Sequence, residues 1–158
     1  MCRTQDSCAG RSLILASITK RYRSLVTRDV WSFYGDLSAA DPASLTDPQR
    51  RLVAILDLRQ EVNAGGFDNY FRAWGGNSAS RAMSALPGVL GHEWATLLHD
   101  AMQVVGSPYP HDGPDQRAAR LDANTTAAMT LDALDERLYE LEASEDVDAR
   151  LADLLGND

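Results

Sequence analysis

Long apolar runs are missing from this 158-residue sequence, and cysteine is scarce. The longest apolar run is a handful of residues, as in 13–16, whereas a transmembrane helix needs about 20. A membrane span is therefore excluded, and the short apolar stretch behind Asp6 does not make a secretory signal. Cys2 and Cys8 cannot form a disulfide framework, and no zinc-ligand spacing is present. We expect a cytoplasmic protein.

Basic residues are nearly absent from the last 38 positions. Residues 121–158 hold 2 Arg against 11 Asp and Glu, a net charge of −9, whereas residues 1–120 hold 13 Arg and Lys against 12 Asp and Glu, a net charge of +1. A concentrated negative charge repels nucleic acid and attracts basic partners. We therefore expect no direct nucleic-acid binding through this part of the chain and a basic protein as its partner.

Period-two alternation is absent, which argues against β-strands. Apolar residues recur at helical spacing instead, and Thr46 with Gln49 forms a capping-box signal. Helices are predicted within 13–37, from Thr46 to Gly65-Gly66, over 67–74, 78–86, 94–105, 131–142 and 147–155, with a loop at 106–116. The fold class predicted is all-α, a compact single-domain multi-helix bundle over residues 13–158, preceded by a flexible basic N-terminal arm over 1–12.

Enzyme signatures are missing from the sequence. There is no nucleophile elbow, no phosphate-binding loop and no dinucleotide fingerprint. His92-Glu93 resembles the start of a zinc-protease helix, but position 96 is Thr. His92 and His99 are seven residues apart and share a helix face with Asp100 nearby, yet a third ligand at helical spacing is lacking. We expect no metal and no cofactor, and an unrecognised enzyme would have to use these three residues.

The most distinctive segment is Glu61–Phe71, with the sequence EVNAGGFDNYF. It predicts a helix stop, a double-glycine turn and then an aromatic face. Phe67, Tyr70, Phe71 and Trp74 fall at i, i+3, i+4 and i+7, so they are expected to pack into the core.

This segment resembles the hallmark of a bacterial family of DNA-mimic proteins, in which a Glu-Val-Asn-Asn-Gly-Gly-Phe-x-Gln-Tyr-Phe stretch recurs. The residues that carry the resemblance are Glu61, Asn63, Gly65, Gly66, Phe67, Tyr70 and Phe71. Leu90-Gly91-His92 and the segment 131–141 (LDALDERLYEL) are similar to two later family patterns and occur in the same order. The resemblance covers residues from about 46 to 155, with Ala64, Asn69 and Leu138 as departures.

The resemblance implies an all-helical homodimer without enzymatic activity. In the family's characterised member, an acidic surface imitates the phosphate rows of DNA and occupies the DNA-binding face of a transcription factor or a histone-like protein.

The acidic residues near the end of the chain suit such a role. Asp132, Glu136 and Glu140 fall at i, i+4 and i+8, and four residues rise about 6 Å along a helix, so these carboxylates form a regular row. Like charges at this spacing destabilise a helix by roughly 0.2–0.5 kcal/mol per pair, which favours a binding role for these carboxylates. The alternative is a solvated acidic face that keeps the protein soluble. The partner-binding residues predicted are Asp132, Asp135, Glu136, Glu140, Glu142, Glu145 and Asp146. An immunity or antitoxin-like inhibitor of a basic toxin or nuclease would use the same residues and is the alternative.

Overall fold

The structure is a computed structural model that describes residues 29–155. Its elements are α2 (Val30–Ala39), η1 (Pro42–Ser44), α3 (Asp47–Arg72), η2 (Trp74–Ser78), α4 (Ala79–Val89), α5 (His92–Val105), α6 (Pro114–Ala123), α7 (Ala127–Ser144) and α8 (Val147–Leu155), where η marks a 3-10 helix. No strand occurs in these residues, and the all-α prediction is confirmed. The predicted arm over 1–12 lies outside the described residues.

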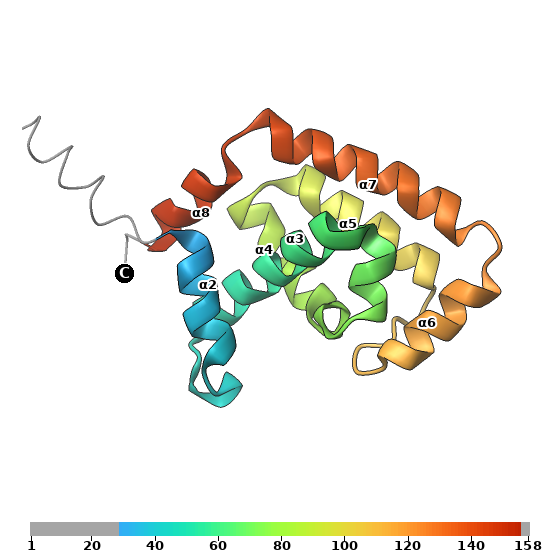
Figure 1. The fold of residues 1–158 in the computed structure, drawn as a ribbon, viewed down its shortest axis with the longest axis horizontal. Helices are drawn as coiled ribbons and strands as arrows, with labels where there is room; N and C mark the ends of the chain where they lie inside the picture. Colours follow the sequence, from blue (N-terminus) through green and yellow to red (C-terminus); the bar gives the residue numbers. More distant parts are fainter. Residues whose placement is uncertain (1–28, 156–158) are drawn as a thin grey trace, which may run out of the picture.

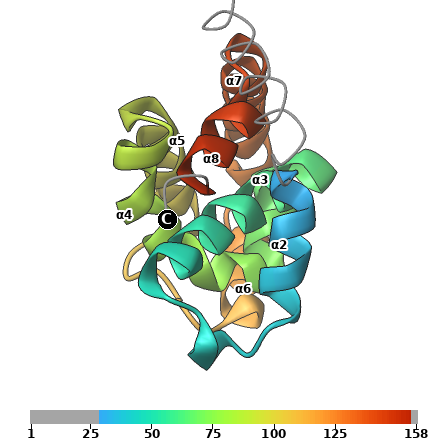
Figure 2. The same cartoon turned by 90° about the vertical axis from the view of Figure 1, so that its left-hand side faces the viewer.

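The helices surround α3, which runs through the middle of the fold (Figure 1). α4 and α5 pack against each other and α4 packs on α3, while α7 lies along the outside and contacts both α3 and α5. α6 lies at one end of the molecule and α2 and α8 lie together at the other (Figure 1), the end that faces the viewer in Figure 2. One long face of α7 is therefore turned away from the protein.

The aromatic residues behind the double glycine supply the centre of the core. Phe67, Tyr70 and Phe71 are each 0% exposed, as predicted, and the Phe67 and Phe71 rings stack with their centroids 6.0 Å apart. The prediction was wrong for Trp74, which is 75% exposed. Because α3 ends at Arg72, the helical phase that would have turned Trp74 inward is lost.

Local signals set several helix ends. The capping box is confirmed, since the Gln49 N–H donates to the Thr46 hydroxyl and the Thr46 N–H donates to the Gln49 side chain. α4 continues past the predicted stop at Pro87 and ends at Val89. The predicted loop at 106–116 is correct up to Gly113, but α6 begins at Pro114 and was not predicted.

α6 contributes one buried charge to the fold. Arg117 is 0% exposed, and its guanidinium donates to the carbonyl oxygens of Phe71 (2.7 Å), Ala73 (2.9 Å), Pro110 (2.7 Å) and His111 (3.2 Å). The first two carbonyls lie at the end of α3, where a helix leaves carbonyl oxygens without intrahelical partners and where positive charge is favourable. Arg117 therefore closes the carboxyl end of the central helix.

Candidate partner-binding surface

α7 is a two-faced helix because its leucines and its carboxylates follow the same period in opposite phase. Leu131, Leu134 and Leu138 are buried against the rest of the fold. On the opposite, exposed face stands the acidic row, which we define as Asp132, Glu136 and Glu140. All three side chains are exposed, and none of them forms an ion pair with any residue in the range 29–155.

Two further predicted carboxylates lie where α7 gives way to α8. Glu145 pairs with Arg150, with Oε2 and Nη1 2.7 Å apart. Asp146 is exposed and accepts the N–H of Ala149 in the first turn of α8 at 3.0 Å. Both carboxylates therefore stabilise the junction between α7 and α8, and they lie beyond the end of the acidic row.

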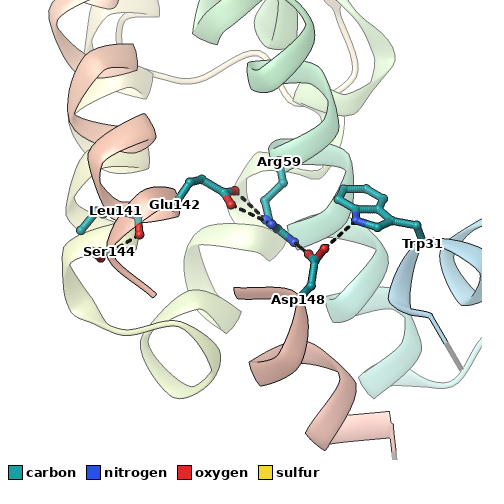
Figure 3. Close-up of polar contacts among 6 residues, drawn as sticks. All are labelled: Trp31, Arg59, Leu141, Glu142, Ser144 and Asp148. Atoms are coloured by element: carbon teal, nitrogen blue, oxygen red, sulfur yellow. Dashed lines mark hydrogen bonds and ion pairs between the residues drawn. The ribbon is translucent and has the colours of Figure 1, made fainter. Parts of the chain in front are cut away.

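Glu142 is bound within the protein by a buried arginine (Figure 3). Arg59, which is 4% exposed, donates from Nε and Nη2 to the two carboxylate oxygens of Glu142, at 2.6 and 2.7 Å. Its Nη1 donates to Asp148 at 2.8 Å, and the other oxygen of Asp148 accepts the indole N–H of Trp31 at 3.1 Å. These four residues, which we call the Arg59 network, join α3, α7, α8 and α2.

Arg59 was missed at the level of sequence because its charge suggested the polar face of its helix. Its position carried a signal, however. Arg59 follows Leu52 by seven residues and Ile55 by four, so it shares their face of α3, and the structure buries that face. An arginine in phase with buried leucines predicts a carboxylate partner from another element, because an unpaired buried charge is very unfavourable.

Asp135 also faces the protein, where it serves the double glycine. α3 is interrupted at Gly65 (φ −170°, ψ 27°) and Gly66 (φ 75°, ψ −178°), and the helix restarts at once. The Asp135 carboxylate accepts the N–H of Phe67 at 2.8 Å, in the first turn after the break. The predicted stop at the glycines is thus a break within one long helix, and Asp135 acts as a capping residue supplied by α7.

The backbone carbonyl oxygens in the turn before the break also have side-chain partners. The Asn69 side-chain amide donates to the Glu61 carbonyl oxygen (3.2 Å) and to its carboxylate (2.7 Å), which ties the two halves of α3 together. The Tyr139 hydroxyl donates to the Val62 carbonyl oxygen at 3.0 Å. Asn63 is exposed on the outer side of the break. The distinctive segment and the 131–141 segment therefore meet, through the bonds of Asp135 and Tyr139.

A groove of about 520 Å³ opens beside the end of the acidic row, between the start of α5 and the second half of α7. Leu97 and Leu141 give it an apolar base, and its charged lining consists of His92, Glu93, Arg137 and Glu140. Glu140 therefore belongs both to the row and to the groove. Glu93, on the facing helix, was not among the residues predicted from sequence.

His92 and His99 do not form a metal site with each other. His92 lines the groove, and His99 lies with Nδ1 3.5 Å from the Asp100 carboxylate on the exposed side of α5. Across the part of the chain that the structure describes, no three His, Cys, Asp or Glu residues are arranged to hold a metal ion. None of the helices in that part is long and apolar enough to cross a bilayer.

Comparison with known proteins places these features in a family. The family model described as DMP19-like protein matches residues 43–157, a range that contains the glycine break, the acidic row, the groove and most of the Arg59 network. The chain belongs to the DMP19-like protein family. That family is one of DNA-mimic proteins. No curated protein and no solved structure matches the chain.

Within residues 29–155 the charge is more negative than the −8 of the full sequence. Residues 29–155 hold 9 Arg, no Lys and 21 Asp and Glu, which gives 9 − 21 = −12. Two of those arginines, Arg59 and Arg117, are buried and present no charge to a partner. The surface that residues 29–155 present is therefore strongly negative, and the acidic row is part of it.

Proposed function

We propose that this DMP19-like protein is a DNA mimic that occupies the DNA-binding surface of a basic protein through the acidic row. The observation that supports this most is the exposure of Asp132, Glu136 and Glu140 in one line, without an ion pair among the described residues. Carboxylates accept charge-assisted bonds from Arg and Lys much as phosphate oxygens do. The family supports the same role.

Only part of the predicted carboxylate set suits the role of phosphate surrogate. Asp135 and Glu142 are engaged by Phe67 and Arg59, and Glu145 by Arg150. We therefore narrow the proposed contact residues to the acidic row, with Asp146 at its margin. Three carboxylates about 6 Å apart carry less charge per length than duplex DNA, which has one charge per roughly 1.7 Å. A homodimer, as the resemblance implied, would supply a second row.

The proposal also accounts for specific physical behaviour. Binding to a basic surface through unpaired carboxylates is fast, weakens with added salt and is displaced by duplex DNA. An antitoxin-like inhibitor of a basic toxin would share the salt dependence, but a toxin that does not bind DNA would be insensitive to duplex DNA. DMP19-like proteins are non-enzymatic in general, and we propose the same here.

The test starts with the full chain as bait in extract of the source cells, eluted in steps of rising salt. The captured protein is purified, and its affinity is measured for the wild type and for the variant D132N/E136Q/E140Q. We expect about a tenfold loss, because three charge-assisted contacts of roughly 0.5 kcal/mol each add up to about 1.5 kcal/mol. The matched control D112N/D115N/D153N removes three exposed carboxylates elsewhere and tests for a non-specific charge effect.

The outcomes distinguish a DNA mimic from an inhibitor of a basic toxin. A selective loss in the row variant, together with displacement of the partner by duplex DNA, supports a DNA mimic. Equal affinity of the row variant and the wild type would reject the row as the contact surface. A selective loss without displacement by DNA would favour the inhibitor of a basic toxin.

A further inference from the structure

We propose that the groove between α5 and α7 receives an arginine side chain of the partner, held between Glu93 and Glu140. This inference rests on the proposed function, because it assumes a basic partner at the acidic row. It extends the contact surface from the ridge of α7 onto α5, and it assigns a role to Glu93.

Continuity with the acidic row is the first argument. Glu140 ends the row and also lines the groove, so a basic segment lying along α7 reaches the groove at its last step. Glu93 is exposed in the first turn of α5 and faces the same space. A side chain that enters there meets a carboxylate from each of two helices.

The lining fits arginine better than a small cation. The half-buried Leu141 offers apolar surface to the methylene stem of a long side chain, and a guanidinium is flat and weakly hydrated. Its five N–H donors can serve two carboxylates at once, which an ammonium point charge does less well. A volume of about 520 Å³ is within the usual range for a ligand pocket and is ample for one such side chain.

Arg137 is the counter-charge in this groove. It is exposed, and it forms no ion pair with another residue of the described part of the chain. Its guanidinium therefore opposes the entry of a second one, while the two glutamates favour it. The proposal therefore predicts opposite effects for two residues of the groove: loss of Glu93 weakens binding of the arginine, and loss of Arg137 strengthens it.

An anion is the competing occupant. His92, Arg137 and the start of α5, which has Gly91 as its N-cap and no side-chain cap, would favour negative charge. Glu93 and Glu140 oppose an anion from both walls, and Glu140 continues into the exposed acidic row. The charges of the lining and its surroundings therefore favour a cation.

The experiment is an NMR titration of the isotopically labelled full chain with N-acetyl-arginine amide, and with N-acetyl-lysine amide for comparison. We expect amide shifts at 92–97 and 137–144, with the arginine compound binding more tightly. E93Q is expected to weaken arginine binding about fivefold and R137Q to strengthen it by a similar factor, the size of one partly exposed charge pair. D115N, an exposed carboxylate on α6, is expected to leave it unchanged. With the purified partner, E93Q is expected to lower the affinity and R137Q to raise it.

Several results would overturn the groove assignment. The first is amide shifts confined to the region of Asp132 and Glu136, with unchanged arginine binding in E93Q. The second is amide shifts with inorganic phosphate rather than with arginine. Groove shifts that follow protein concentration would indicate a second copy as the occupant, and groove shifts caused by R21Q/R23Q without a probe would indicate the chain's own basic segment. The first result leaves the proposed function intact. Conversely, a partner affinity that falls in E93Q and in E140Q but not in D132N/E136Q would reject the acidic row while supporting the groove.

Discussion

Asp135 and Phe67 lie 68 positions apart, and the carboxylate of the first accepts the backbone N–H of the second at 2.8 Å. A helix that restarts after a glycine break has N–H groups without intrahelical partners, and a carboxylate is the preferred acceptor at that position. Here the acceptor comes from α7 rather than from the chain just before the helix. The two segments that resembled a family pattern are thus in direct contact, because one caps the helix that the other restarts.

Removal of this carboxylate is expected to destabilise the protein. Asp135→Ala leaves the Phe67 N–H unsatisfied in a partly buried site, and we expect a loss of about 1–3 kcal/mol in the free energy of unfolding. Asp135→Asn keeps an acceptor oxygen and is expected to lose less. Urea denaturation measures both, with Asp132→Ala on the exposed face of the same helix as the control. Equal stability of Asp132→Ala and Asp135→Ala would contradict the capping role.

Gly66 is expected to tolerate no side chain. Its φ of 75° lies in the left-handed region, and a Cβ there would collide with the Asp135 carboxylate. Gly66→Ala is therefore expected to lower the free energy of unfolding by about 2 kcal/mol or more, through backbone strain and displacement of the capping carboxylate.

Gly88→Ala is the matched control for this glycine. Gly88 lies in α4 with nothing within 4 Å of an added Cβ, so alanine there is expected to leave stability unchanged or to raise it, by up to about 1 kcal/mol. Thermal unfolding of the two variants gives the comparison. A Gly66→Ala protein as stable as Gly88→Ala would show that the break relaxes without the glycine.

Local patterns predicted what local physics decides. The Thr46 capping box, the burial of Phe67 and the exposure of Glu136 all follow from spacing within one turn or two. The continuation of α3 past the glycines did not, because it depends on a carboxylate from α7. α6 was missed because the Pro- and Gly-rich residues before it dominate the pattern and Leu121 is its only buried apolar residue.

The candidate surface shows the same division. The row was predictable because buried leucines fix which face of α7 points outward. Glu142 follows Leu138 by four residues and so lies on the leucine face of α7, where its charge needs a partner from another element. That partner, Arg59, comes from a helix more than eighty residues earlier, so spacing along α7 carries no information about the pair.

Loss of Arg59 from the Arg59 network is expected to be strongly destabilising. Arg59→Met leaves Glu142 and Asp148 without their cation, and breaking a buried pair from one side costs about 3–5 kcal/mol. Arg51→Met, which removes an exposed pair with Asp47, is expected to cost at most about 0.5 kcal/mol. Denaturation midpoints of the two variants check this. Similar midpoints would indicate that solvent compensates Glu142 and Asp148.

Asp57 gives a prediction with a definite pH sign. Its carboxylate accepts the Tyr34 hydroxyl at 2.6 Å, and burial raises its pKa above the ordinary 3.8, assisted by the nearby negative charge of Glu61 and opposed by the Tyr34 bond. Between 3.8 and the raised value, the folded protein holds a proton that the unfolded chain has released. Stability from this group is therefore greatest in acid and falls as the pH rises through that window.

Asp57→Asn is expected to remove this penalty, because the amide oxygen still accepts the Tyr34 hydroxyl and carries no charge to desolvate. We expect the melting temperature to rise at pH 7, by about 2–4 °C for each kcal/mol recovered, and the difference from the wild type to shrink as the pH falls through the raised pKa of Asp57 toward its ordinary value of 3.8. Asp153→Asn, at an exposed position on α8, is the control and is expected to show no such pH-dependent gain. A lower melting temperature for Asp57→Asn at pH 7 would mean that the ionised carboxylate stabilises the fold through Tyr34 by more than its burial costs.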